Sequence, residues 1–154
     1  MREEKDTSKV LEELNNATSL RKGLSSIEEN KDNFLNVSFG AYFNRYLANH
    51  SERKLADIIR DSGLDRKYAY AVANDTRNAN RDKIIALCFA AGMNQDEMNH
   101  ALIYAGHNAL YARNKRDAII ILAINSKCRG DKEYVTATDL SIFIDEQGQE
   151  PLDI

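Results

Sequence analysis

The chain has 154 residues, a net charge of −3, a single proline and only seven glycines, and it is rich in helix-favouring residues. A chain of this length can bury about two thirds of its unfolded surface, and this composition predicts an all-α fold. No apolar run reaches the roughly 20 residues of a membrane span, and the charged first thirty residues do not resemble a secretory leader, so we expect a cytoplasmic protein with no membrane partner.

Residues 1–37 are expected to form an N-terminal helical extension. The segment SKVLEELNNA carries one short amphipathic stripe. Further along, Ser25, Ser26, Ile27 and Glu28 have the form of a capping box, which predicts a helix that starts there and runs toward Phe34 and Leu35. The extension is therefore expected to contain short helices.

Residues 38–106 show a stronger pattern, which predicts five helices. Apolar and aromatic residues recur at helical spacing from Ser38 to about His50. Ser51 is expected to cap a second helix that ends at Ser62 and Gly63, where glycine permits a left-handed conformation. Three further helices are then expected. The first is capped by Asp65 and ends near Asn74, the second is capped by Asn80 and ends at Gly92, and the third begins at Asn94 and ends at Gly106.

Residues 107–154 are expected to form a C-terminal helical extension that packs on this core. The stretch RDAIIILAINSK predicts a mostly buried helix, and a last amphipathic helix is expected to begin near Thr138 and to end at Gly148. Residues 131–154 contain one basic and seven acidic side chains. By contrast, residues 66–83 carry five basic and two acidic side chains, and residues 113–129 carry five and one. The small net charge thus hides two basic segments and an acidic tail.

The run GLDRKYAYAVANDTRNANRDKIIAL resembles the helix-turn-helix family of phage lambda repressor and Cro, the XRE type, in its turn glycine, capping aspartate, basic third helix, polar loop and apolar fourth helix. The match spans about residues 39–106, and the rest of the chain looks like a longer subgroup with flanking helices. The resemblance implies a lambda-repressor-like core of about five helices. It also implies a non-catalytic regulator that binds double-stranded DNA as a dimer, with the third helix in the major groove.

Carried over by position, the outward face of the third helix would present Arg66 and Lys67 to guanine or phosphate and Tyr70 to a thymine methyl group or phosphate. Arg77, Arg81 and the start of the second helix, Arg53 and Lys54, would contact phosphates. The DNA-binding residues that the resemblance implies are Lys54, Arg66, Lys67, Tyr68, Tyr70, Asn74, Arg77 and Arg81.

The sequence departs from the family pattern at Ile59 and Ser62 in the second helix and at Asp75 and Ala79 in the loop after the third. Asp75 would place a negative charge close to the expected path of a phosphate. Together with the net acidity, it motivates an alternative: a protein-interaction module that keeps this fold without binding DNA and contacts a partner through its C-terminal helices or acidic tail.

The basic segment ARNKRDAIII is consistent with an additional phosphate contact or with a solvated first turn of a buried helix. Cys88 and Cys128 lack a paired CxxC motif, and the three histidines lack the spacing of a metal site. Adjacent carboxylates diverge on a helix, and no catalytic motif is present. The sequence therefore predicts no enzyme, no metal site and no cofactor.

Overall fold

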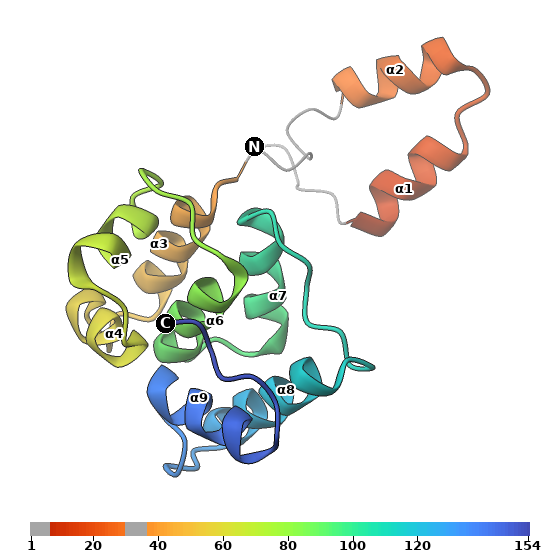
Figure 1. Cartoon of the computed structure of the whole chain (residues 1–154). Helices are drawn as coiled ribbons and strands as arrows, with labels where there is room; N and C mark the ends of the chain where they lie inside the picture. Colours follow the sequence, from red (N-terminus) through yellow and green to blue (C-terminus); the bar gives the residue numbers. More distant parts are fainter. Residues whose placement is uncertain (1–6, 30–36) are drawn as a thin grey trace. The chain divides into compact units, whose positions relative to one another are not determined.

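The computed structural model describes residues 7–29 and 37–154, and within these ranges the chain forms nine α-helices and no strand (Figure 1). The predicted all-α fold is confirmed. The chain divides into two compact units, residues 1–36 and residues 37–154, which we call the N-terminal and C-terminal units. None of the described helices has the length and apolar character that crossing a membrane requires.

The N-terminal unit contains α1 (Thr7–Asn15) and α2 (Leu20–Glu29). The hydroxyl of Ser19 accepts a hydrogen bond from the Lys22 amide (3.1 Å), so Ser19 caps α2. The expected capping box at Ser25 is wrong, because Ser25 lies inside α2 and the helix starts a turn and a half earlier. Phe34 and Leu35, toward which that helix was expected to run, lie outside the described residues.

The C-terminal unit contains the remaining seven helices, and five of them match the predicted core. They are α3 (Phe39–Asn49), α4 (Leu55–Ser62), α5 (Arg66–Ala73), α6 (Arg81–Ala91), α7 (Gln95–Tyr104), α8 (Lys115–Cys128) and α9 (Ala137–Glu146). The side chains of Asp65, Asn80 and Asn94 accept amide hydrogen bonds at the helix starts where caps were expected, and Ser38 caps α3 in the same way. The last helix begins at Ala137, one residue before the expected start, because Thr136 and Asp139 form its capping box.

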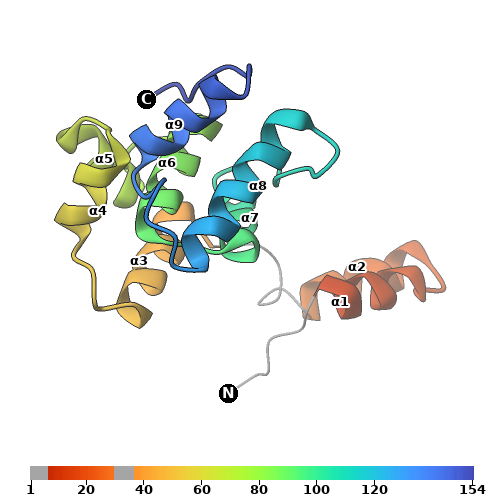
Figure 2. The same cartoon turned by 90° about the horizontal axis from the view of Figure 1, so that it is seen from below.

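Helix α6 is the centre of the C-terminal unit, packed against α4, α7 and α9 (Figures 1 and 2). Every residue from Ile84 to Ala91 is buried, which explains why its sequence is apolar on all sides. Its N-terminus is capped by Asn80, and at its C-terminus Gly92 adopts a left-handed conformation (φ 86°).

The C-terminal end of α6 meets a cluster of donors. Lys127 donates to the Phe89 carbonyl, Arg53 to that of Ala90 (2.8 Å) and the Tyr46 hydroxyl to that of Ala91 (3.2 Å). Two cations thus neutralise the partial negative charge of the helix end. Arg53 therefore lies before α4 and not on its outward face, where the sequence placed it. The predicted cap at Ser51 is also wrong, because α4 starts only at Leu55, after a turn that lets Arg53 reach α6.

Helices α8 and α9 pack against each other and close the core from the C-terminal side. Ile120 and Ile124 of α8 and Leu140 and Ile144 of α9 are fully buried. After α9, Leu152 is buried and its amide donates to the Ser141 hydroxyl of α9 (3.0 Å), and the Asp153 amide donates to the Asp82 carboxylate of α6 (3.0 Å). The C-terminal residues thus belong to the same core as α6.

Candidate nucleic-acid interface

The α4–α5 pair is a helix-turn-helix with a turn of three residues, 63–65. Gly63 takes a left-handed conformation (φ 72°), which glycine adopts without steric cost. Asp65 caps α5 through its Oδ2, 3.0 Å from the Tyr68 amide. On the inner face, Ala69, Val72 and Ala73 of α5 are buried against the core. These small residues fix which face of α5 points outward.

The outward face of α5 carries Arg66, Lys67 and Asn74, all exposed, and the half-buried Tyr70. The Arg66 guanidinium lies over the Tyr70 ring, 5.7 Å from its centroid, and this contact limits the freedom of the arginine. Among the described residues, none forms an ion pair or hydrogen bond with the Lys67 ammonium. Lys67 is therefore free to pair with an external anion.

A second pair of cations meets the Tyr68 ring beside α5. The Arg77 guanidinium lies 5.1 Å from the ring centroid and the Lys83 ammonium 5.9 Å. The Tyr68 hydroxyl donates to the Asn78 carbonyl (3.4 Å), which ties the ring to the loop after α5. Tyr68 thus links the basic residues of this loop and of α6 to those of α5.

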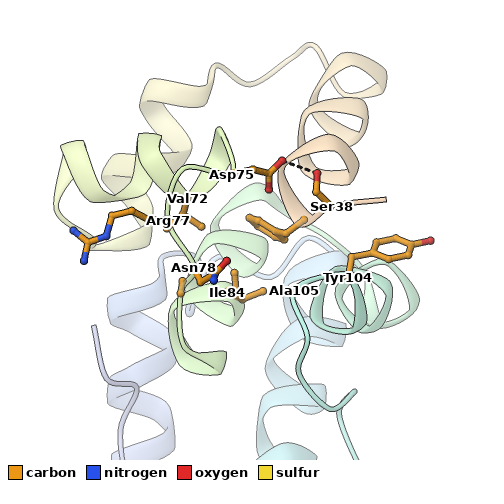
Figure 3. Close-up of a pocket in the computed structure, with 10 residues that line it drawn as sticks. Ser38, Val72, Asp75, Arg77, Asn78, Ile84, Tyr104 and Ala105 are labelled. Carbon is orange, nitrogen blue, oxygen red and sulfur yellow. Dashed lines mark hydrogen bonds between the residues drawn. The ribbon is translucent and has the colours of Figure 1, made fainter. Parts of the chain in front are cut away.

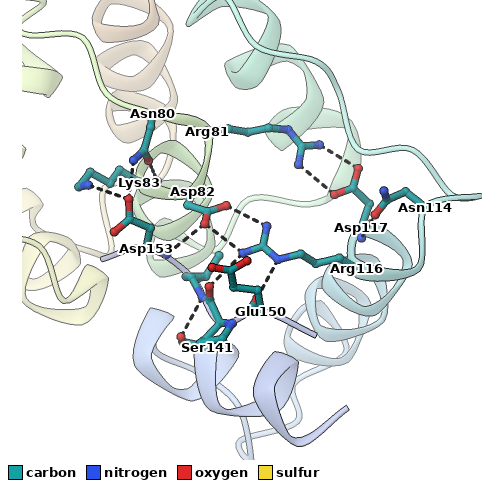
Figure 4. Close-up of polar contacts among 12 residues, drawn as sticks. Asn80, Arg81, Asp82, Lys83, Asn114, Arg116, Asp117, Ser141, Glu150 and Asp153 are labelled. Atoms are coloured by element: carbon teal, nitrogen blue, oxygen red, sulfur yellow. Dashed lines mark hydrogen bonds and ion pairs between the residues drawn. The ribbon is translucent and has the colours of Figure 1, made fainter. Parts of the chain in front are cut away.

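Lys83 was not among the predicted site residues. Two sequence signals could have pointed to it: it belongs to the basic segment 66–83, and it lies one turn after the Asn80 cap. Its ammonium also lies 3.6 Å from the Asp153 carboxylate, which accepts a hydrogen bond from Asn80 (2.9 Å; Figure 4). The start of α6 therefore already has one anionic neighbour.

The Asp75 side chain turns away from the α5 face toward the start of α3 (Figure 3). Its carboxylate accepts hydrogen bonds from the Ser38 hydroxyl (2.5 Å) and the Gly40 amide (2.8 Å). Asp75 has a left-handed backbone (φ 62°), an uncommon conformation that aspartate tolerates better than most residues. Its charge is therefore directed at a helix N-terminus, where a carboxylate is favourable.

Asp75 also lies at the edge of a small pocket beneath the loop, about 210 Å³ in volume (Figure 3). Val72 and Ile84 form its apolar floor, and Arg77 and Asn78 lie at its rim. The Thr76 and Arg77 amides both donate to the Ala71 carbonyl, at 2.9 and 3.2 Å. The loop that carries Arg77 is thus held in one conformation by α5.

Arg81 lies apart from the α5 face. It forms a two-pronged ion pair with Asp117 of α8, both N···O distances being 2.9 Å, and it donates to the carbonyls of Asn108 and Ala109 (Figure 4). Three-quarters of the Arg81 side chain is buried. Arg81 therefore joins α6 to α8. Nothing in this geometry supports the expected contact of Arg81 with a phosphate.

In the second basic segment, residues 113–129, some of the cations are likewise bonded within the fold and others are exposed. Arg116 pairs with Asp82 of α6 through two bonds (2.9 and 3.0 Å), and Lys127 lies at the end of α6. Burial disfavours the charged form of Asp82, but the hydrogen bonds from Arg116 and the Asp153 amide outweigh it and keep the pKa of Asp82 below its usual value. Of the five basic side chains in this segment, only those of Arg113, Lys115 and Arg129 are exposed.

Lys54 is exposed at the start of α4 and makes no capping hydrogen bond. Between α4 and α5 runs a groove of about 340 Å³ whose walls include Ile59 and Leu64. Arg60, Arg66 and Tyr70 line the same groove. The surface of the helix-turn-helix therefore combines basic side chains with an apolar depression.

No family model, curated protein or solved structure matches this chain. In the described part of the chain, no three histidine, cysteine or acidic side chains gather in a group that could hold a metal ion. Burial raises the pKa of the Cys88 thiol, so Cys88 is held in its neutral form. The exposed cations on and beside α5 are Arg66, Lys67 and Arg77, whereas Lys83 already pairs with Asp153.

Proposed function

We propose that this protein is a non-catalytic regulator that binds double-stranded DNA through α5. The observation that carries this proposal is the α4–α5 helix-turn-helix with Arg66 and Lys67 exposed in the first turn of its second helix. Residues at this end of a recognition helix are those that reach base edges in the major groove. The short turn with its left-handed Gly63 and the Asp65 cap of α5 support the proposal.

Within this proposal the cations have different tasks. Arg66 and Lys67 donate to guanine O6 and N7 or to phosphates, and Tyr70 contacts a thymine methyl group. Arg77 and Lys54, at the edges of the motif, contact phosphates and fix the register. The orientation of Asp75 toward α3 removes the main objection from the sequence, since its charge is shared with the donors of that helix.

Selection from a random pool of DNA duplexes, followed by fluorescence anisotropy on the enriched site, tests the proposal. We expect R66A/K67A to weaken binding to that site by about 10-fold or more, and R77A to weaken binding to all duplexes and to lower the salt slope by about 1. R129A/K132A is the matched control, because it removes two exposed cations that follow α8 and lie outside the segment ARNKRDAIII. A wild-type protein without salt-dependent DNA binding at low ionic strength would show the proposal to be wrong.

The groove between α4 and α5 favours a second candidate, an acidic and apolar peptide segment of a partner protein. Ile59 and Leu64 would receive its apolar side chains, and Arg60 and Arg66 would pair with its carboxylates. This candidate predicts that R60A abolishes capture of one stoichiometric partner, whereas K67A leaves it unchanged. DNA binding predicts the reverse for these two variants, because Lys67 lies outside the groove lining and on the outward face.

A further inference from the structure

The N-terminal unit exposes more apolar surface than its size explains. Nine large apolar side chains are exposed over the described residues, and four of them lie within residues 7–29. They are Leu11 (55% exposed), Leu20 (82%), Leu24 (59%) and Ile27 (40%). Apolar side chains gathered in so short a segment mark a surface that another protein surface covers.

Three of these residues form one stripe on α2. Leu20, Leu24 and Ile27 are spaced by four and three residues, so they lie on one face of the helix. The two helices of this unit have 9 and 10 residues, a length at which isolated helices are marginal in water. A helix this short with its apolar stripe exposed needs packing against a further surface to be stable.

The charges beside the stripe indicate which surface that is. Arg21 and Glu28 are seven residues apart, two turns along α2, and therefore lie on the same flank of the stripe. When two copies of α2 pack antiparallel about a twofold axis near Leu24, the same flanks face each other, and Arg21 of one copy lies beside the partner's Glu28. The axis produces this pair twice.

We propose that α2 is a homodimerisation helix, which packs its Leu20, Leu24 and Ile27 stripe antiparallel against the α2 stripe of a second copy of the chain. Leu11 of α1 is exposed as well. The proposal does not depend on DNA binding, because it rests only on the residues of α1 and α2. It assigns the dimer contact to the N-terminal unit, whereas the sequence had suggested a partner for the C-terminal helices.

Sedimentation equilibrium of the full chain at a series of concentrations tests this assignment. We expect the wild type to form a dimer and L20E/L24E to be a monomer over the same range. L122E/I142E is the matched control, because Leu122 (62%) and Ile142 (49%) are comparably exposed in the C-terminal unit. A monomeric wild type, or a dimer that L122E/I142E disrupts while L20E/L24E does not, would overturn the proposal.

The charge pairs allow a second and more specific measurement. R21E and E28R should each raise the dimer dissociation constant about five- to tenfold, since each change places like charges together at two symmetric positions. The double variant R21E/E28R restores the pairs in reversed order and should dimerise as tightly as the wild type. Failure of the double variant to recover would exclude the antiparallel arrangement, and recovery cannot be explained by unfolding of either single variant.

Discussion

At the scale of single residues, Gly40 allows α3 to approach the end of α5 closely. Gly40 lies there because a Cβ at this position would come within 2.5 Å of both the Ala73 carbonyl oxygen and the Asp75 carboxylate. Asn44 joins the same two elements, donating to the carbonyls of Gly40 (2.9 Å) and Ala73 (3.0 Å). This joint holds the position of α5 relative to α3.

We expect G40A to destabilise the C-terminal unit by roughly 1–3 kcal/mol, because the Ala73 backbone cannot move away without disturbing α5. The melting temperature and the free energy of unfolding in urea measure this effect. The matched control is G23A, the same exchange inside α2, where the new Cβ would make an ordinary contact at 3.6 Å with the Ala17 side chain. If G40A unfolds at the same urea concentration as the wild type, the joint contributes no stability.

Contacts such as these explain why the sequence misplaced some site residues. The partners of Asp75 precede it by 35 and 37 residues, and Asp117 follows Arg81 by 36 residues. Spacing along one helix carries no information about such pairs. The family resemblance therefore implied the outward positions of Arg66 and Lys67, which depend on one helix, but the sequence could not foresee that Asp75 turns toward α3 or that Arg81 is held by α8.

At the scale of elements, capping chemistry explains where the prediction succeeded and where it failed. Asp65, Asn80 and Asn94 were identified correctly as caps because each stands directly before an amphipathic or apolar run. Ser25 and Ser51 have the right chemistry, but α2 starts earlier, after the Ser19 cap, and α4 starts later, at Leu55. Before α4, the Arg53 guanidinium bonds to the end of α6 and to Asp61.

The end of α6 makes a pH-dependent contribution through Lys127. Burial and the nearby Arg53 disfavour its charged form and lower its pKa from 10.5 to about 8. Between these two values the unfolded chain binds a proton that the folded chain has released, so unfolding becomes less favourable as the pH rises. We expect the stability of the wild type relative to K127M to increase from pH 8 toward pH 10.

Urea denaturation of both proteins across this pH range measures the difference. Comparison with K127M removes the contributions of Cys88 and Tyr46, whose pKa values burial raises and which therefore act in the opposite direction in both proteins. A difference in unfolding free energy that stays constant with pH would mean that Lys127 keeps its proton throughout.

At the scale of the whole molecule, the cations fall into two groups, those bonded within the fold and those left on the surface. Many of the cations of the C-terminal unit are used within the fold, as Arg81, Arg116 and Lys127 are, whereas those of the α5 surface meet rings or solvent. Several of the acidic side chains that produce the net charge of −3 act inside the fold as caps and ion pairs. A chain with an acidic net charge can in this way present a basic surface of limited extent.

The proposed α2 dimer and the proposed DNA contact of α5 together predict bivalent binding. A dimer that places two α5 helices on one duplex gains an effective concentration at the second half-site, so we expect the wild type to prefer a palindromic site over a single half-site by about 10²-fold or more. L20E/L24E should lose most of this preference and still bind the half-site as the wild-type subunit does, because its α5 surface is unchanged. Titration of both duplexes with both proteins measures the two ratios. Equal loss of half-site and palindrome binding in L20E/L24E would instead place the substituted residues in direct contact with DNA, and an unchanged preference would place the dimer contact outside α2.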